Sequence, residues 1–165
     1  MHIILEQQVS LASAKAAFDR LHEAIGRVTP SRFLTLNDRE LKIIGFSWQK
    51  ADYCRELARS IIARRFSPNA LGRMNDDEAR ASLLELKGIG LWSADIYLLM
   101  VLGRPDVWPS GDLALATAAH EVKQLLARPS PSELQSLGDA WRPWRAVAAR
   151  LLWHHYLSQR RNKTQ

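Results

Sequence analysis

The chain has 165 residues, 47% of them hydrophobic, which suits one globular domain or two small helical lobes. Its one cysteine, Cys54, excludes an intrachain disulfide, an iron-sulfur cluster held by four thiolates and a cysteine-based zinc site. No stretch approaches the roughly 18 apolar residues of a membrane span, and the N-terminus lacks a secretory signal pattern, so we expect a soluble cytoplasmic protein with no membrane partner. The net charge of +6 is compatible with a polyanionic partner such as nucleic acid but is weak evidence by itself.

The predicted secondary structure is helical throughout. Apolar residues recur at helical spacing over residues 3–25, 51–62, 91–102 and 147–157, and no stretch shows the alternation of a strand. Breaks fall at residues 26–30, 67–72, 88–90, 103–111 and 128–131. We therefore predict an all-α fold, with one domain over residues 1–157. Residues 158–165, which include Arg160, Arg161 and Lys163, are expected to form a frayed basic tail.

A helix end, a glycine turn and a new helix occur twice along the chain. Residues 41–47, followed by Lys50 and Ala51, resemble residues 84–90, followed by Ser93 and Ala94. The first copy has only one glycine at its turn, Gly45. Two interpretations stay open for it: a second hairpin of the same kind, or an ordinary corner between two helices.

The second copy carries a pattern that suits phosphate binding. Gly88 and Gly90 flank Ile89 between two helical stretches. Such a turn can adopt positive φ at both glycines, bury Ile89 between the helices and expose backbone N–H groups at the start of the next helix. Those N–H groups and the helix dipole favour an anion, and glycine lets a nucleic-acid strand approach closely. The alternative is a tight turn with no ligand.

Asp112 follows a loop rich in proline and glycine and precedes a new apolar helical stretch. A carboxylate at that position is a good helix N-cap, and capping is the simpler interpretation when the residue is considered alone. Further along, Trp141-Arg142-Pro143-Trp144-Arg145 forms an aromatic and basic segment, in which Pro143 suits the first turn of a helix. Trp153 and Trp141 are expected to pack between helices.

Together these motifs resemble the 3-methyladenine DNA glycosylase II branch of the helix-hairpin-helix (HhH-GPD) superfamily of base excision DNA glycosylases. The resemblance covers residues 3–156, and Asp112 lies 22 residues beyond Gly90. Lys87 stands where the family's hairpin commonly has proline, which places a cation beside the expected phosphate. The resemblance implies DNA contacts from Gln8, Lys87, Gly88, Ile89, Gly90 and Trp92. It implies no cofactor, except that the backbone carbonyls of Gly88 and Gly90 can hold a structural monovalent cation.

The resemblance also implies an activity: hydrolysis of the N-glycosidic bond of alkylated purines in double-stranded DNA by a monomeric enzyme of base excision repair. Asp112 would be the catalytic carboxylate that stabilises an oxocarbenium-like transition state. Trp144 would stack on the cationic base, and Trp92 and Ile96 would line the base pocket. Bifunctional lyases of the superfamily carry a lysine at the position of Trp92, so we expect a hydrolase without lyase activity. A non-catalytic DNA-binding module is the alternative.

The N-terminal residues 3–12 resemble the family's Ile-Leu-Gly-Gln-Gln-Val-Ser segment, with Glu6 in place of the glycine. Gln7 or Gln8 would fill the gap that a flipped-out base leaves in the duplex, and Gln7 would also contact the base. A polar helix face is the alternative interpretation. Larger family members carry a further N-terminal domain before this segment, so two hypotheses remain: a minimal glycosylase, or a natural start upstream of Met1.

Overall fold

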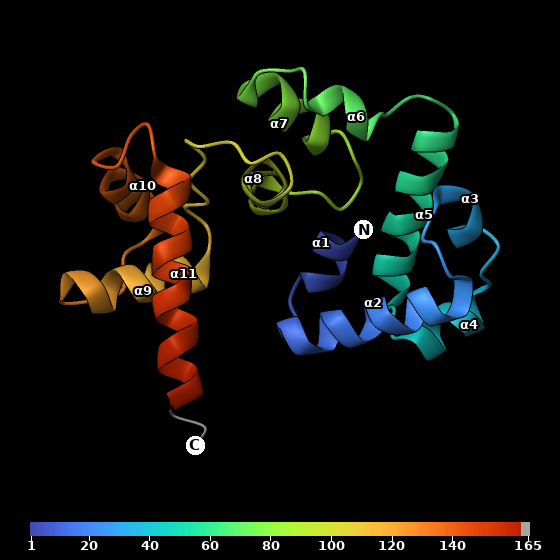
Figure 1. Ribbon diagram of the computed structural model, residues 1–165, viewed down its shortest axis with the longest axis horizontal. Coiled ribbons are helices and arrows are strands. Elements are labelled where there is room, and N and C mark those ends of the chain that lie inside the picture. Colours follow the sequence, from blue (N-terminus) through green and yellow to red (C-terminus); the bar gives the residue numbers. More distant parts are fainter. Residues whose placement is uncertain (163–165) are drawn as a thin grey trace. The chain divides into compact units, whose positions relative to one another are not determined.

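The computed structural model describes residues 1–162, with side chains described to residue 160, as helices joined by short connections (Figure 1). No residue in this range forms a strand, which confirms the all-α prediction. The helices are α1 (His2–Glu6), α2 (Leu11–Ile25), α3 (Pro30–Phe33), α4 (Asp38–Ile44), α5 (Trp48–Ile62), α6 (Pro68–Leu71), α7 (Asp76–Leu84), α8 (Leu91–Met100), α9 (Leu113–Lys123), α10 (Pro131–Asp139) and α11 (Arg145–Asn162).

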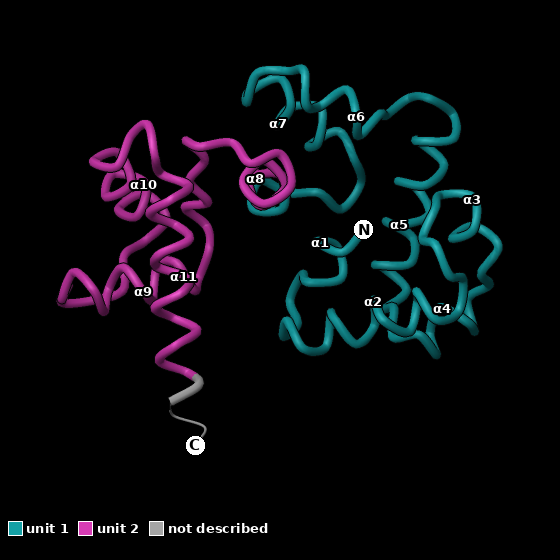
Figure 2. Tube along the Cα trace, viewed as in Figure 1, with its two compact units in different colours: residues 1–93 teal, residues 94–165 magenta. Residues whose placement is uncertain are grey.

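The chain divides into two compact units, Met1–Ser93 and Ala94–Gln165, called unit 1 and unit 2 below (Figure 2). Helix α8 begins in unit 1 and ends in unit 2. The assignment of residues 1–157 to one domain stays a prediction. Within residues 1–162, none of the helices combines the length and the apolar character that crossing a bilayer would need.

Local sequence signals explain where most helices begin. Asn37, Asn75 and Ser130 each form a capping box, in which the cap side chain accepts from the third helical residue and a glutamate side chain returns to the cap N–H. Ser10 caps α2 and Ser47 caps α5, and in each case the serine side chain accepts a hydrogen bond from the N–H of the third helical residue. These bonds satisfy N–H groups that have no partner inside the helix, so the helix starts are fixed by short stretches of sequence.

The core of unit 1 is built around α5. Helices α1 and α3 pack on α5, while α2 packs on α1 and α4. Leu21, Phe33 and Cys54 are completely buried in this core. Gly45 ends α4 in the left-handed conformation, with φ of 110°, so α4 and α5 form the first helix corner that the sequence predicted. Whether that corner binds a ligand stays a prediction.

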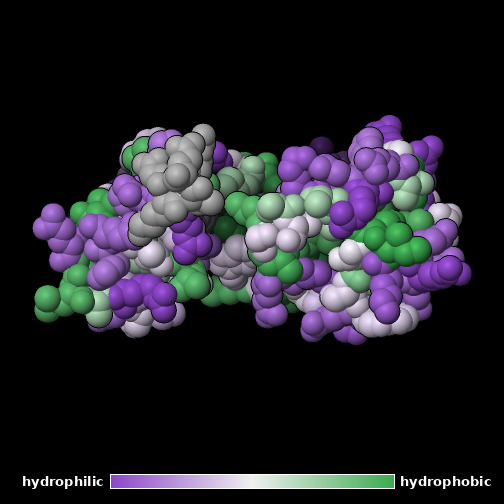
Figure 3. Space-filling view, turned by 90° about the horizontal axis from the view of Figure 1, so that it is seen from below, coloured by the Kyte–Doolittle hydropathy of each residue, from purple (hydrophilic) through white to green (hydrophobic). Residues whose placement is uncertain are grey.

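The core of unit 2 forms where α9 packs against α11 and α10. Leu98, Leu115 and Leu134 are completely buried there. On the face shown in Figure 3, groups of hydrophobic side chains lie between hydrophilic ones. Trp144 is among the large hydrophobic side chains that remain exposed, with 61% of its surface accessible.

Helix α11 continues beyond the stretch that periodicity predicted. It runs to Asn162, so residues 158–162, which we assigned to the basic tail, are helical. Arg160 contributes to this extension, since its guanidinium lies 4.2 Å from the ring centroid of Tyr156, one turn earlier. Lys163 and the side chain of Arg161 lie outside the described residues.

Candidate functional site

The hairpin between α7 and α8 depends on one of its two glycines for its backbone conformation. Gly88 has φ of +82°, whereas Gly90 is not in the positive-φ region, so the expectation of positive φ at both glycines was wrong. A Cβ on Gly88 would lie 2.1 Å from Cδ2 of Tyr53. A Cβ on Gly90 would meet no atom within 4 Å. Gly88 therefore shapes the turn, and Gly90 leaves open space beside it.

Ile89, between the two glycines, and Lys87, before them, both make contacts within the folded protein. Ile89 is half-buried against the unit 1 core, and its N–H donates to the carbonyl of Leu86 over 3.0 Å. The ammonium of Lys87 lies 2.7 Å from Oδ2 of Asp52. This pair raises the pKa of Lys87 and lowers that of Asp52, and both groups are exposed. Lys87 thus reaches the hairpin surface as a cation that already has a carboxylate neighbour.

Gln7 ties the N-terminal segment to the hairpin. It follows α1, and its Nε2 donates to the carbonyl of Gly88 over 2.8 Å and to Oγ of Ser93 over 2.9 Å. Gln8, the next residue, is exposed and has φ of +57°, which is uncommon for a residue with a side chain. Filling the gap in a duplex would require Gln7 to give up both bonds, so Gln8 is the better placed of the two candidates for that role.

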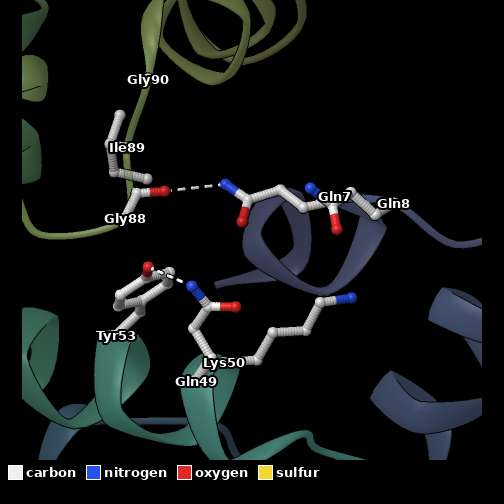
Figure 4. Close-up of a pocket in the computed structure, with 8 residues that line it drawn as sticks. All are labelled: Gln7, Gln8, Gln49, Lys50, Tyr53, Gly88, Ile89 and Gly90. Carbon is white, nitrogen blue, oxygen red and sulfur yellow. Dashed lines mark hydrogen bonds between the residues drawn. The ribbon is translucent and has the colours of Figure 1, made fainter.

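Gln7, Gln8 and the hairpin line one side of a pocket of about 300 Å³ within unit 1 (Figure 4). Gln49, Lys50 and Tyr53 of α5 line the other side. The Gly88 carbonyl that the family resemblance assigned to a monovalent cation is on this side and already accepts from Gln7. Among the described residues there is no cluster of three His, Cys, Asp or Glu side chains that could hold a metal ion. A cation at the hairpin stays a prediction.

The remaining predicted pocket residues lie on α8. Trp92 is half-buried in the first turn, at the end of unit 1, and Ile96 is buried within unit 2 with 7% of its surface accessible. The assignment of these two side chains to a base pocket stays a prediction.

Asp112 caps α9, as the simpler interpretation predicted. Its Oδ1 accepts from the N–H of Leu115 over 2.7 Å, and only 9% of the residue is accessible. The indole Nε1 of Trp153 on α11 donates to the same oxygen over 3.0 Å. Two donors from two helices therefore hold one carboxylate oxygen, which fixes the position of the group in a largely buried environment.

The loop before Asp112 is anchored at two points. The buried indole of Trp108 donates to the carbonyl of Leu134 over 2.8 Å, and it lies so close to Gly138 that a Cβ there would be 2.5 Å from the indole nitrogen. Arg145 at the start of α11 forms a bidentate pair with Asp106, with distances of 2.7 and 3.0 Å, and also donates to the Asp106 carbonyl. Arg145 holds the pKa of Asp106 below its ordinary value. The Asp112 loop is thereby fixed to α10 and α11.

The aromatic segment before α11 differs from the prediction. Helix α11 begins at Arg145, so Pro143 precedes the helix rather than forming its first turn, and the Arg142–Pro143 bond is cis. Residues 141–144 form a turn closed by Trp144 N donating to the carbonyl of Trp141 over 2.7 Å. Trp144 is exposed, and its role in base stacking stays a prediction.

Two tryptophans that we expected to pack between helices have different environments. Trp141, in the turn before α11, packs against Trp108 of the loop before α9, with ring centroids 5.3 Å apart. Trp153 does more than pack, because it donates to Asp112. A half-buried indole N–H normally finds an acceptor, and that rule was the signal available in the sequence. It could not name Asp112, since the two residues are 41 positions apart.

Comparison with known proteins identifies the family. The profile of the HhH-GPD superfamily base excision DNA repair proteins matches residues 1–143. The DNA-3-methyladenine glycosylase of Bacillus subtilis is 26% identical over 162 residues, which cover 91% of this chain and 54% of that protein. The alkylbase DNA glycosidase-like protein mag2 of Schizosaccharomyces pombe is 29% identical over 126 residues, which cover 76% of this chain and 59% of that protein. The chain thus spans little more than half the length of these curated relatives.

Solved structures agree with the sequence relatives. The 3-methyladenine DNA glycosylase Mag1 of Schizosaccharomyces pombe, in complex with abasic DNA, superposes with a TM-score of 0.86 at 25% identity, covering 92% of this chain and 76% of that one. A DNA-3-methyladenine glycosidase from Bacillus halodurans gives a TM-score of 0.80 at 28% identity, covering 94% and 72%. This chain belongs to the HhH-GPD superfamily of base excision DNA repair proteins. The curated relatives and solved structures described above are named as 3-methyladenine or alkylbase DNA glycosylases, which is the branch that the sequence motifs indicated.

Proposed function

We propose that the chain is a monofunctional DNA glycosylase that hydrolyses the N-glycosidic bond of alkylated purines in double-stranded DNA, as a step of base excision repair. The observation that carries this proposal is the buried carboxylate of Asp112, held by Leu115 N–H and by the Trp153 indole. Such a protein would be found with DNA in the cytoplasm or nucleoid.

The proposed chemistry follows from the charge that develops in the reaction. When the base departs, positive charge builds on the deoxyribose, and a fixed carboxylate facing C1′ stabilises that charge. Because Asp112 is held in place by two donors before substrate binds, little reorganisation is required in the transition state. Orientation of the attacking water is a second role open to the same group.

Alkylated purines suit a site that contains aromatic side chains. Alkylation at a purine ring nitrogen gives a cationic base that is already a good leaving group, and an indole face attracts cations. Trp153 places an indole beside the carboxylate, and Trp144 lies exposed before the same helix. We propose Trp153 as an aromatic residue of the base site, in addition to Trp144, Trp92 and Ile96.

The hydrolytic rather than lyase chemistry rests on Trp92. An imine with C1′ requires an amine, and the indole of Trp92 cannot form one. Lys87, the nearest lysine in sequence, is paired with Asp52. No covalent adduct should be trapped by borohydride on abasic DNA. A trapped adduct would contradict the proposal.

A non-catalytic DNA-binding module is the second candidate, because the bond from Leu115 N–H makes Asp112 the N-cap of α9, and that structural role alone would explain the aspartate. Free bases released from methylated DNA separate the two functions. A glycosylase releases 3-methyladenine or 7-methylguanine, and the Asp112→Asn protein does not. A protein that binds the same DNA but releases no base is the module.

A further inference from the structure

Lys87 and Asp52 form an ion pair at the edge of the hairpin that the proposed chemistry does not use. Lys87 stands directly before Gly88 in the turn between α7 and α8, and Asp52 is in the first half of α5. The lysine Nζ lies 2.7 Å from Oδ2 of the aspartate, across 35 positions of sequence. The cation that the hairpin contributes therefore already has a partner of opposite charge.

Packing between the hairpin and α5 explains why these two side chains meet. Gly88 lies directly against the ring of Tyr53, so the residues that precede each of them, Lys87 and Asp52, are brought side by side (Figure 4). Gln7 also holds this turn, through its bond to the Gly88 carbonyl. The pair is thus a consequence of backbone positions that are fixed before any ligand binds.

Two arginines of α5 also act on Asp52 at longer range, but each has a carboxylate partner of its own. These pairs are Arg55 with Asp38, and Arg59 with Glu56. The pKa of Asp52 is lowered first by the hydrogen bond and the charge of Lys87, and only to a smaller extent by the two arginines. Lys87 is therefore the principal partner of Asp52, and it is the cation that opening of the pair would set free.

The pair is exposed, and its exposure makes the partners exchangeable. Lys87 has 62% of its side chain accessible, and Asp52 has 53%. Water and salt screen an ion pair in such a position, so it stabilises the fold little and opens at small cost. A buried pair would resist the exchange, because separating it would leave a charge without a partner in surroundings of low polarity.

A phosphate at the hairpin would offer Lys87 a second anion. Backbone N–H groups at the start of α8 and the positive end of its dipole favour an anion near Gly90, where an added Cβ would meet no atom within 4 Å. The Lys87 ammonium is a compact charge with three N–H donors, so a phosphate oxygen suits it as well as a carboxylate oxygen does. Asp52 and a phosphate of the DNA backbone are therefore competitors for one cation.

We infer that Asp52 limits the affinity of this chain for DNA by competing with a backbone phosphate for Lys87. On binding, Lys87 exchanges the carboxylate for the phosphate, and Asp52 is left beside the DNA with its charge uncompensated. The inference rests on the DNA binding that is part of the proposed function, and it requires no base release. It makes Asp52 a residue that sets affinity and salt dependence, with no part in the chemistry at Asp112.

Binding of one duplex over a series of salt concentrations tests the exchange. The probe is a duplex with a single tetrahydrofuran abasic analogue, and the protein is the full chain. Asp52→Asn should bind it about threefold or more tightly than wild type at low salt, because Lys87 no longer has to leave a carboxylate. The dependence of log Kd on log salt should be steeper by up to about one, since wild-type Asp52 takes up a cation when it loses Lys87. Kd values equal to those of wild type at every salt concentration would overturn the inference.

Two further variants keep the test specific. Lys87→Gln should weaken binding, and Asp52→Asn should give little further gain once Lys87 is replaced. An equal gain in both backgrounds would overturn the inference, because the carboxylate would then repel the DNA directly. Asp19→Asn is the matched control, since it removes the same charge from an exposed pair, with Lys15 of α2 at 2.6 Å. A gain of the same size in this control would mean that net charge explains the effect, which also overturns the inference.

Base release from methylated DNA, measured with protein in excess, separates this inference from the proposed function. Asp52→Asn leaves both bonds to Asp112 in place, so it should release bases at the wild-type rate once all the DNA is bound. Base release by wild type, together with an unchanged Kd for Asp52→Asn, refutes only the inference. Tighter binding by that variant without base release supports the inference in a non-catalytic protein. A chain that binds no duplex at all refutes both.

Discussion

The indole nitrogen of Trp153 lies 3.0 Å from Oδ1 of Asp112, and it joins the middle of α11 to the first residue before α9. Because the same oxygen accepts from Leu115, the carboxylate is held by its own helix and by a neighbouring one. Asp112 therefore has a structural role, as the residue that joins α9 to α11, and is also the candidate catalytic carboxylate. The two roles can be separated by experiment.

Replacing Trp153 by phenylalanine tests the bond from α11. The variant keeps an aromatic ring but removes the N–H, and a hydrogen bond to a charged group is worth about 1.5–3 kcal/mol. We expect single-turnover release of alkylated bases to fall by about tenfold or more. Trp48→Phe, an exposed tryptophan on α5, is the matched control, since it leaves the bonds from Leu115 and Trp153 to Asp112 in place. Wild-type release by Trp153→Phe would mean that the indole does not position Asp112.

Replacing Asp112 separates capping from catalysis. Asparagine caps helices about as well as aspartate, so Asp112→Asn should unfold close to the wild-type temperature. Without the negative charge, base release should fall by about 100- to 1,000-fold, as for loss of one preorganised electrostatic group. Asp112→Ala should show the same loss of release and also lose about 1 kcal/mol of stability. An asparagine variant with full activity would leave Asp112 only as a cap.

Local parts of the site could be predicted from the sequence, and its long-range contacts could not. The turn at Gly88 and the cap at Asp112 depend on backbone conformation over a few residues, which composition and spacing reveal. The bond from Gln7 to Gly88 joins residues 81 positions apart. Helical periodicity shows which face of a helix is buried, but it does not name the partner of a polar side chain there.

The same limit explains the errors at the two motifs. The sequence suggested positive φ at Gly90 because either glycine could adopt it, yet the structure needs it only at Gly88, where Tyr53 approaches. Proline at position 143 suits a first helical turn, but α11 begins two residues later, where Arg145 pairs with Asp106. Tertiary contacts decided between conformations that the local sequence allowed.

Alanine at the two hairpin glycines should give different defects. At Gly88 the new Cβ would overlap Tyr53 and force φ of +82° on a residue with a side chain, which alone costs about 1–2 kcal/mol, so Gly88→Ala should be clearly destabilised in urea. At Gly90 the Cβ meets nothing, so Gly90→Ala should be about as stable as wild type. If a phosphate approaches there, Gly90→Ala should weaken DNA binding with little change in the salt slope, because the backbone N–H groups of the turn carry no net charge. Unchanged binding by a folded Gly90→Ala would argue against that approach.

The pair between Arg145 and Asp106 should make stability depend on acid pH. Arg145 lowers the pKa of Asp106 below its ordinary value of 3.8, so below about pH 4 the unfolded chain binds a proton that the folded protein resists. The stabilisation is fully present above the unfolded pKa and is lost as the pH falls through the lower, folded pKa. Asp106→Asn should therefore melt below wild type at pH 7, and the difference should shrink as the pH falls below 4.

Thermal midpoints of both proteins between pH 3 and pH 7 would check this dependence. Asp19→Asn is a suitable control, because Asp19 pairs with Lys15 on the exposed surface of α2, where an ion pair contributes at most about 0.5 kcal/mol. A difference between wild type and Asp106→Asn that stays constant over this range would show that the carboxylate charge does not stabilise the loop. In that case Arg145 would fix the Asp112 loop through its bond to the Asp106 carbonyl, which the substitution leaves in place.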